Sequence, residues 1–330
     1  MADRDKIRWG ILAPGRITRK FARDLVLLDD AEIVAVASRS QERADQFGDE
    51  FHVPRRYRSY EQLVHDPDVD AIYVAAPHNL HAEHSVLCLE HGKPVLCEKP
   101  FTANAGQARE IVRAAREHKV FCMEAMWMRF LPAVVKLREL LAAGAIGSIR
   151  MVEGMHGFRG PYLPEERLLN PRLAGGALLD MGIYPISLAF MVLGRPSHIS
   201  SMAHIGKTGV DEQSSVLFGY EHGEIAICTS AIQTVLPTRA CITGTEGIIR
   251  IDDGPAVIYK FAVEKGNGQP HQAYEPPHLG LGYTYEAMEV HRCLREGRLE
   301  SDAMPLDESV AIMETLDQIR AQWGMRYPFD

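Results

Sequence analysis

A lysine directly after an apolar run is the first residue of this sequence that could take part in chemistry. The run Val95–Cys97 has the composition of a buried strand, and Glu98-Lys99-Pro100 follows it without a break. In open α/β sheets, ligands bind outside the carboxyl ends of the strands. The sequence therefore places Lys99 where it can meet a cofactor, and it suggests a redox site.

A second candidate group lies in the segment that runs from Gly175-Gly176 through Asp180 to Tyr184. If this segment is helical, Asp180 and Tyr184 lie on one face, because residues four apart are neighbours on a helix. Both side chains can then point into one pocket. On spacing alone, a capped helix with a buried tyrosine is the simpler explanation.

The elements that must position these residues alternate between strand and helix over residues 6–124. Helical stretches near 16–28, 40–51, 81–91 and 104–118 separate the expected strands, which are Ile7–Leu12, Ile33–Ala37, Ala71–Ala75, Val95–Cys97 and Val120–Met123. This alternation predicts a doubly wound parallel sheet, so the fold class is α/β with a Rossmann-type N-terminal domain.

The first strand runs into the glycine turn Gly10-Ile-Leu-Ala13-Pro14-Gly15. A full dinucleotide fingerprint has glycine where this chain has Ala13. Gly15 would still let the backbone approach a pyrophosphate, and the N-terminus of the following helix, at Arg16 and Ile17, would attract it. The turn therefore predicts a dinucleotide cofactor.

The second strand ends in Ser38-Arg39, where a site specific for NAD commonly has Asp or Glu to bind the ribose 2′-hydroxyl. A carboxylate would repel a 2′-phosphate, whereas a hydroxyl and a guanidinium accept one. The pair favours NADP, with NAD as a possible substitute, over a merely solvated surface arginine.

The segment Ala75–His81 ends the third expected strand and starts a helix, so its backbone would lie along the dinucleotide. His81 and His84 share a helix face, but two histidines at this spacing with no carboxylate partner in view are weak evidence for a metal site, so we predict none and interpret them as structural or cofactor-lining. The cofactor-binding residues that we predict are Ala13, Pro14, Gly15, Arg16, Ile17, Ser38, Arg39, Ala76, Pro77, Asn79, His81, Glu98 and Lys99.

The pattern changes after about residue 125. A helix is expected over Pro132–Ala143, a polar loop over Glu264–Pro277, and two further helices near 282–297 and 307–323. Between them lie closely spaced strand candidates, Ser148–Gly157, His198–His204, Gln213–Tyr220, Glu224–Thr234, Ala240–Thr243, Ile248–Ile251 and Ala256–Phe261. We expect an open, mostly antiparallel sheet with helices on one face, and we divide the chain into a cofactor domain (1–124) and a substrate and oligomerisation domain (125–330).

Composition excludes several classes of protein. The 330 residues carry a net charge of −8, which argues against a nucleic-acid surface. We find no signal peptide and no apolar run of the roughly 18 residues that a membrane span needs. The six cysteines form no C-x-x-C pair, so we expect reduced thiols, a cytoplasmic protein and no zinc site.

Taken together, four ordered motifs resemble the glucose–fructose oxidoreductase / inositol dehydrogenase / MocA (Gfo/Idh/MocA) family. The motifs are Gly10–Ile17, Glu98–Pro100, Glu124–Phe130 and Gly175–Tyr184. The resemblance implies a Rossmann domain, an open antiparallel sheet that often forms oligomers (a dimer or tetramer here), and a cis bond before Pro100. Many members have histidine where this chain has Tyr184, and tyrosine there is similar to the dimeric dihydrodiol dehydrogenase and NADP-dependent xylose dehydrogenase branch.

The resemblance also implies hydride transfer between a nicotinamide and the carbinol carbon of a sugar, cyclic polyol or trans-diol. Tyr184 would be the acid/base, with Lys99 lowering its pKa from about 10 and Asp180 orienting the substrate hydroxyl or Lys99. In the alternative assignment, Lys99 is the proton donor and Tyr184 positions the substrate. The substrate-binding residues that we expect are Trp127, Arg129, Phe158, Asp180 and Tyr184.

Two other functions fit the same fold. A glycosidase that uses a tightly bound NAD transiently would show no net cofactor turnover, and Arg39 counts against its NAD site. A non-catalytic NADP-sensing protein would have lost its catalytic residues. The presence of Lys99, Asp180 and Tyr184 disfavours it.

Overall fold

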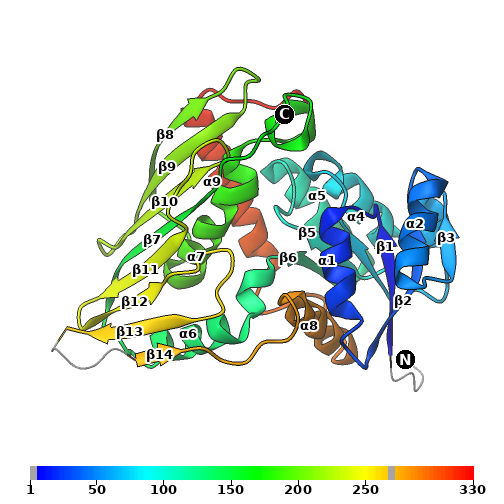
Figure 1. Ribbon diagram of the computed structural model, residues 1–330, viewed down its shortest axis with the longest axis horizontal. Helices are drawn as coiled ribbons and strands as arrows, with labels where there is room; N and C mark the ends of the chain where they lie inside the picture. The colour runs from blue at the N-terminus through cyan, green and yellow to red at the C-terminus, as the bar shows by residue number, and fades with distance from the viewer. Residues whose placement is uncertain (1–5, 267–271) are drawn as a thin grey trace. The chain divides into compact units, whose positions relative to one another are not determined.

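The computed structural model describes residues 6–266 and 272–330, and the chain divides into two compact units (Figure 1). The first unit comprises Met1–Phe130 and His278–Val310, and the second comprises Leu131–Pro277 and Ala311–Asp330. The sequence predicted a single division after residue 124. The structure differs because the chain returns to the first unit after residue 277.

The first unit is built on a six-stranded parallel sheet in the order β3-β2-β1-β4-β5-β6. Its strands are β1 (Ile7–Leu12), β2 (Ala31–Ala37), β3 (Arg55–Tyr57), β4 (Ala71–Val74), β5 (Val95–Glu98) and β6 (Cys122–Ala125). The helices between them are α1 (Arg16–Leu25), α2 (Gln41–Phe51), α3 (Tyr60–Val64), α4 (His81–Glu90) and α5 (Ala105–His118). The α/β fold class is confirmed, while β3 and α3 are too short to give a periodic signal.

The returning segment brings α8 (Tyr283–Arg295) onto the first unit. The carboxylate of Asp24 accepts hydrogen bonds from the main-chain N–H groups of Leu281 and Tyr283, the latter at 2.8 Å. The indole of Trp9 donates to His291 Nε2 at 3.0 Å in the interior of the unit. These contacts explain why residues 278–310 belong with the first sheet.

The second unit contains an eight-stranded sheet in the order β14-β13-β12-β11-β7-β10-β9-β8. The strands are β7 (Ile149–Gly157), β8 (His198–Ile205), β9 (Asp211–Gly219), β10 (Ile225–Ala231), β11 (Arg239–Gly244), β12 (Gly247–Ile251), β13 (Phe261–Lys265) and β14 (Gln272–Tyr274). All neighbours are antiparallel except β7 and β10. The prediction of a mostly antiparallel sheet is therefore confirmed.

Two sequence predictions in this sheet are wrong. The strand expected over 256–261 begins only at Phe261, because Ala256 and Ile258 are buried outside any strand after the turn at 252–255. The expected loop 264–277 contains the short edge strand β14. Residues 267–271 of that loop lie outside the described part of the chain.

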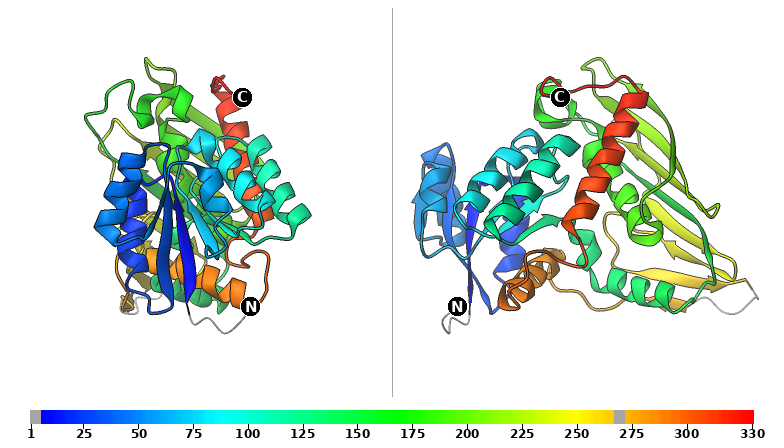
Figure 2. Two further views of the ribbon diagram at one scale, coloured as in Figure 1. Left: turned by 90° about the vertical axis from the view of Figure 1, so that its right-hand side faces the viewer. Right: turned by 180° about the vertical axis from the view of Figure 1, so that it is seen from behind.

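Helices α6 (Pro132–Ala142) and α7 (Ile183–Leu193) and the second-unit part of α9 (Leu306–Gln322) lie on one face of this sheet (Figure 2). The strands alternate accordingly, since Ala226 and Cys228 of β10 are buried while Ile225 is exposed on the other face. Gly154 of β7 allows α7 close approach, because a Cβ there would lie 2.6 Å from Pro185 Cβ. The predicted arrangement of one covered and one open face is thus present.

The sequence analysis overlooked one apolar stretch of membrane-span length. The helical stretch Pro171–Leu193 has 23 residues and a mean hydropathy of 1.7 in its most apolar window, enough to cross a membrane by length and composition. However, 83% of that window is buried inside the protein. This is the position of a core helix that packs against the sheet.

Candidate active site

The turn between β1 and α1 has open space beside its glycine. Ala13 adopts the left-handed backbone region with φ 64°, at the position where the full fingerprint has glycine. The N–H of Gly15 donates to Thr18 Oγ1 at 3.1 Å, and a Cβ at Gly15 would meet only Ala13 O, at 4.0 Å. No acidic residue lies in the first turn of α1. The turn therefore fits an anionic group at the helix N-terminus.

At the end of β2, Ser38 is buried and Arg39 is exposed. Ser38 Oγ accepts the N–H of Ser40 at 3.2 Å. Burial raises the pKa of Tyr60, while hydrogen bonds from the Arg39 side chain and main chain act in the opposite direction. Among the described residues, no carboxylate forms an ion pair with Arg39 or with Arg43, which faces solvent one turn further on. The strand end therefore presents two arginines whose charge is not neutralised by an ion pair among the described residues.

The end of β4 is tied to the loop after β5 by His81, which is fully buried. Its Nδ1 lies 2.9 Å from Pro100 O, and its Nε2 lies 2.8 Å from Ala76 O. Burial lowers the pKa of His81 to about 4, so the ring is neutral and donates only one of these contacts. In the same turn, the buried Asn79 Oδ1 has no hydrogen-bond partner in the described structure. Ala76 and Asn79 thus lie at the strand end where the sequence predicts cofactor contacts. Among the described residues, none donates a hydrogen bond to Asn79 Oδ1.

The loop after β5 carries Lys99 in a fixed main-chain setting. Glu98 accepts a short hydrogen bond from the Tyr73 hydroxyl, and its other oxygen accepts the N–H of Lys99 at 3.0 Å. The Lys99–Pro100 bond is cis, which confirms that prediction. Glu98 is buried and Lys99 is half-exposed. Glu98 therefore supports the loop from inside, through the main-chain N–H of Lys99.

Two further buried carboxyl groups lie near this loop. Glu124 of β6 accepts the N–H of Phe101 at 3.0 Å, and burial raises the pKa of Glu124 to about 7. Glu286 of α8 is fully buried, and neither of its carboxyl oxygens has a hydrogen-bond partner among the described residues. Burial, then the charges of Glu98 and Asp24, raise the pKa of Glu286 well above its ordinary value. Both carboxyl groups consequently bind a proton more tightly than the same groups do in water.

Arg129 and Trp127, which the sequence assigned to substrate binding, have partners inside the first unit. Arg129 is buried and pairs with Glu308 at 2.5 Å, and it also donates to Ala303 O at 3.3 Å. The indole of Trp127 is buried and stacks on Tyr283 with a centroid distance of 4.8 Å. These contacts account for both side chains as structural elements of the first unit, and their role toward substrate stays a prediction.

In the second unit, the helix that carries Asp180 and Tyr184 begins with a π-turn (Leu178–Gly182) and continues as α7. Two glycines precede it. A Cβ at Gly175 would lie 2.5 Å from Arg167 O, and Gly176 has φ +119°. Residues 180–184 are helical, which meets the condition set for Asp180 and Tyr184 in the sequence. Irregular π-turns of this kind occur frequently at functional sites.

The structure adds two residues beside this helix that the sequence analysis missed. The guanidinium of Arg167 lies 3.0 Å from Asp180 Oδ1, and the ring of His156 meets Tyr184 edge-on at a centroid distance of 5.4 Å. Asp180 and Tyr184 are nearly buried, while 40% of the Arg167 side chain is exposed. No local pattern in the sequence indicates this pairing, because Arg167 and Asp180 are 13 residues apart and meet only in the folded structure.

Phe158 lies at the end of β7 and is 37% exposed. Its ring meets that of Tyr162 at 5.9 Å. The exposed ring of Phe158, beside the half-buried ring of Tyr162, offers an apolar surface of the kind that the sequence predicts for a substrate. The predicted residues thus form two sets, one at the carboxyl ends of β1, β2, β4 and β5 in the first unit, and one around the π-turn in the second.

Comparisons with known proteins agree with this geometry. The family described as "Oxidoreductase family, NAD-binding Rossmann fold" matches residues 7–126, and the GFO/IDH/MocA C-terminal domain matches residues 134–250. The chain is 39% identical to trans-1,2-dihydrobenzene-1,2-diol dehydrogenase of Mus musculus over 98% of this chain and 99% of the relative. It is 37% identical to D-xylose 1-dehydrogenase (NADP(+)) of Hypocrea jecorina, over 98% and 93% of the two chains.

Among solved structures, the fold is similar to that of aldose-aldose oxidoreductase from Caulobacter crescentus. The two share a TM-score of 0.87 and 24% identity over 97% of this chain and 98% of the other. The order of the motifs, the two sheets and the family matches over most of the chain all agree. The chain is therefore a member of the Gfo/Idh/MocA family of oxidoreductases.

Proposed function

We propose that this chain is an NADP-dependent dehydrogenase that oxidises a CH–OH group of a sugar, cyclic polyol or trans-diol, or reduces the corresponding carbonyl. The single observation that carries the cofactor choice is the positive end of β2, where Arg39 and Arg43 have no acidic partner among the described residues. A 2′-phosphate would supply the missing charge. The NADP(+) dependence in the name of the xylose dehydrogenase relative points the same way.

Bound NADP would supply the hydride acceptor or donor. The open side of Gly15 and the unused acceptor of Asn79 fit such a dinucleotide. Toward the substrate, Tyr184 would take or give the hydroxyl proton, and Lys99 is the alternative candidate for this role. Asp180, held by Arg167 at 3.0 Å, would accept a hydrogen bond from a neighbouring substrate hydroxyl.

The substrate class rests on the relatives and on the polar groups of the second unit. Dihydrodiol and xylose dehydrogenases both act on carbons that carry hydroxyl groups next to another hydroxyl or ring oxygen. The carboxylate of Asp180 and the hydroxyl of Tyr184 could each form a hydrogen bond with one of two adjacent substrate hydroxyls. The exposed ring of Phe158, which contacts the half-buried ring of Tyr162, would cover an apolar face of the substrate ring.

The deciding experiment is a fluorescence titration of NADPH and of NADH with the wild-type protein and with Arg39→Ala. We expect the wild type to prefer NADPH, and the variant to bind NADPH about 10- to 100-fold more weakly while NADH binding changes little, since a guanidinium–phosphate contact is charge-assisted. Arg113→Ala removes an equally exposed arginine from α5 and controls for net charge. Equal binding of both cofactors by the wild type would contradict the NADP assignment.

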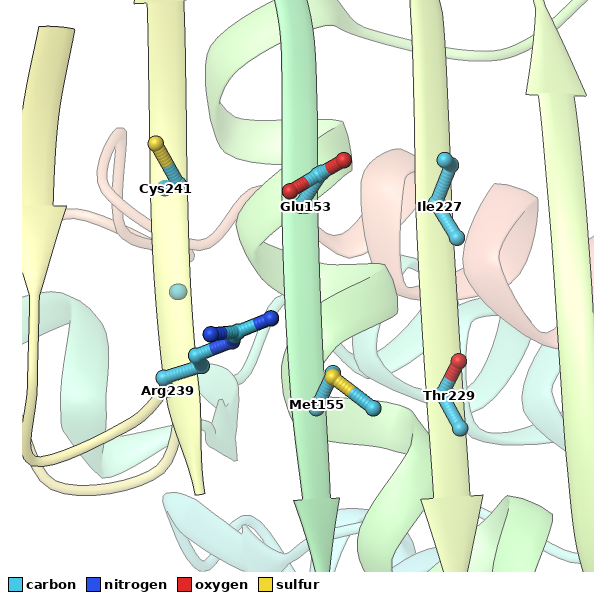
Figure 3. A pocket seen from close by; sticks show the side chains of 7 residues that line it. Glu153, Met155, Ile227, Thr229, Arg239 and Cys241 are labelled. Atoms are coloured by element: carbon cyan, nitrogen blue, oxygen red, sulfur yellow. The ribbon is translucent and has the colours of Figure 1, made fainter. Parts of the chain in front are cut away.

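We also propose that the open face of the second sheet mediates a homo-oligomer. This face presents Met202, Leu217 and Ile225 as exposed apolar side chains. Figure 3 shows its centre, where Met155, Glu153 and Arg239 project from β7 and β11 beside Ile227, Thr229 and Cys241. Light scattering of the wild type and of Met202→Lys tests this proposal. A monomeric wild type, or an oligomer whose mass Met202→Lys leaves unchanged, would refute it.

A further inference from the structure

Asp211 is a buried carboxyl group with one strong contact, and that contact is to the helix that carries Asp180 and Tyr184. Asp211 is the first residue of β9 and is fully buried. Its Oδ2 accepts the main-chain N–H of Leu178 at 2.7 Å. Leu178 is the first residue of the π-turn, so the contact holds the start of the helix to the sheet.

The structure around this contact leaves little freedom. Gly176 has φ +119°, and a Cβ there would fall well inside van der Waals contact with Asp211 Oδ1. On the other side of the π-turn, a Cβ at Gly182 would lie 3.0 Å from Ser230 Oγ of β10. Glycine at both positions therefore lets the π-turn lie directly against β9 and β10, with the Asp211 carboxyl group as its anchor.

Helix starts usually obtain their cap from the residue just before the helix. Here Ala177 supplies no side-chain cap, and the acceptor comes from a strand 33 residues later in the chain. A cap from a neighbouring strand fixes the rotation and height of the helix relative to the sheet, which a local cap does not. Asp180 and Tyr184 follow two and six residues after the anchored N–H.

We propose that Asp211 is a positioning residue for the reaction, which sets the placement of Asp180 and Tyr184 by anchoring the π-turn to β9. This role rests on the proposed function, because it concerns the acid/base and orienting residues of that reaction. The strongest contact of Asp211 is to the main chain at Leu178, and in our proposal Asp211 affects the substrate only through the residues that it holds in place.

Few charged groups surround Asp211 in the second unit. Arg320 of α9 and the ring of Tyr327 are the ionisable neighbours that interact with it. Arg320 is already paired with Asp317 and Asp330, and Asp211 Oδ1 has no partner in the described structure. Burial consequently raises the pKa of Asp211 to about 7, against hydrogen bonds from main-chain N–H groups that lower it.

The anchor can therefore exist in a neutral and an ionised form near neutral pH. A carboxylate accepts from an N–H more strongly than a neutral carboxyl group does. The ionised form should hold the π-turn more firmly, so part of the pH dependence of kcat should follow Asp211 and disappear when that residue no longer ionises.

The test compares Asp211→Asn and Asp211→Ala with the wild type. Asparagine keeps an oxygen that can accept from Leu178 but does not ionise, and alanine removes the acceptor. We expect kcat of the alanine variant to fall about tenfold or more, as for misplaced catalytic groups, with unchanged NADPH affinity. The asparagine variant should keep kcat within about threefold at pH 6 and lose the pH step near 7.

A second readout does not depend on turnover. Hydrogen exchange of the peptide 175–184 should be faster in Asp211→Ala than in the wild type or in Asp211→Asn, because the Leu178 N–H loses its acceptor. If no sugar or diol is turned over by the wild type, the proposed function fails while this measurement still tests the anchor.

A matched variant controls for loss of any buried aspartate. Asp24→Asn makes the same change at the start of α8 in the first unit, where Asp24 also caps a helix. It should leave the pH step in kcat unchanged. The proposal is overturned if Asp211→Ala keeps kcat within twofold, or if both Asp211 variants retain the wild-type pH profile.

Discussion

The two units each hold one helix to the rest of the unit with a buried aspartate, but the two aspartates are not equally satisfied. Asp24 receives the N–H groups of Leu281 and Tyr283 at the start of α8, with contacts to both of its oxygens. Asp211 receives Leu178 on one oxygen and nothing on the other in the described structure. A fully bonded carboxylate is a static anchor, whereas a half-bonded one near neutral pKa can change state.

The two helices also differ in what they carry. The first buried acid of α8 is Glu286, which has no hydrogen-bond partner among the described residues and whose pKa is raised by burial. The helix that starts at Leu178 carries Asp180 in an ion pair with Arg167 and Tyr184 beside His156. A buried aspartate that binds the start of a helix thus stabilises the first unit and, in our proposal, positions the reacting groups of the second.

The largest effect should come from the chemistry of the second helix. Tyr184→Phe removes the proposed acid/base, so kcat should fall at least about 100-fold, the usual contribution of such a group, while NADPH affinity is retained. Tyr220→Phe removes a hydroxyl that is also buried but lies at the end of β9 without a partner, and it should keep kcat within about twofold. Steady-state kinetics on the best substrate of a panel of aldoses and trans-diols would show the difference.

The glycine beside the Asp211 anchor should be the most sensitive position for stability. Gly176→Ala combines a left-handed backbone with a clash against Asp211, and we expect a loss of about 3 kcal/mol or more in the free energy of unfolding. Gly194→Ala has φ +77° but nothing within 4 Å of the new Cβ, so it should lose only about 1 kcal/mol. Urea denaturation measures both, and equal losses would show that the anchor does not constrain Gly176.

Removing the acceptor of Asp24 should lower the free energy of unfolding more than neutralising its charge does. Asp24→Ala removes the buried carboxylate that accepts the part-buried N–H of Leu281 and the buried N–H of Tyr283, which should lower the free energy of unfolding by about 2–3 kcal/mol. Asp24→Asn keeps one acceptor and should lose about half as much. A smaller loss for alanine than for asparagine would mean that Asp24 is not an anchor.

The smallest effect is a pH dependence of stability from Glu286. Its pKa is raised by folding, so its contribution is fully present below the unfolded value near 4.5 and is lost as the pH rises toward the folded value. Glu286→Gln should therefore match the wild type at pH 4 and exceed it by about 1–2 kcal/mol at pH 8. Thermal unfolding at the two pH values measures this, and a variant less stable than the wild type at pH 8 would contradict it.

The parts of the site that follow from local sequence could be predicted. Ser38 and Arg39 are read directly from the end of one strand, and Glu98-Lys99-Pro100 from the end of another, because parallel strands present their carboxyl ends to ligands. The Rossmann strands were found for the same reason, since continuous apolar runs between amphipathic helices leave few alternatives.

The rest depends on contacts that no local pattern encodes. Asp211 meets Leu178 across 33 residues, and Asp24 meets Leu281 across 257. A surface arginine such as Arg167 looks the same in a sequence whether it faces solvent or pairs with Asp180. The return of α8 to the first unit could not be predicted either, because its apolar face fits either sheet until a specific partner such as Trp9 is known.

The split of the first unit has a consequence for how this protein is made. Its sheet is complete by residue 130, but the helix that covers Trp9 and bonds to Asp24 ends only at Arg295. A ribosome must therefore synthesise nearly all of the second unit before the first can close. Since nascent domains normally fold in order of synthesis, this chain departs from that order: the side of the first sheet around Trp9 stays uncovered until α8 has been synthesised.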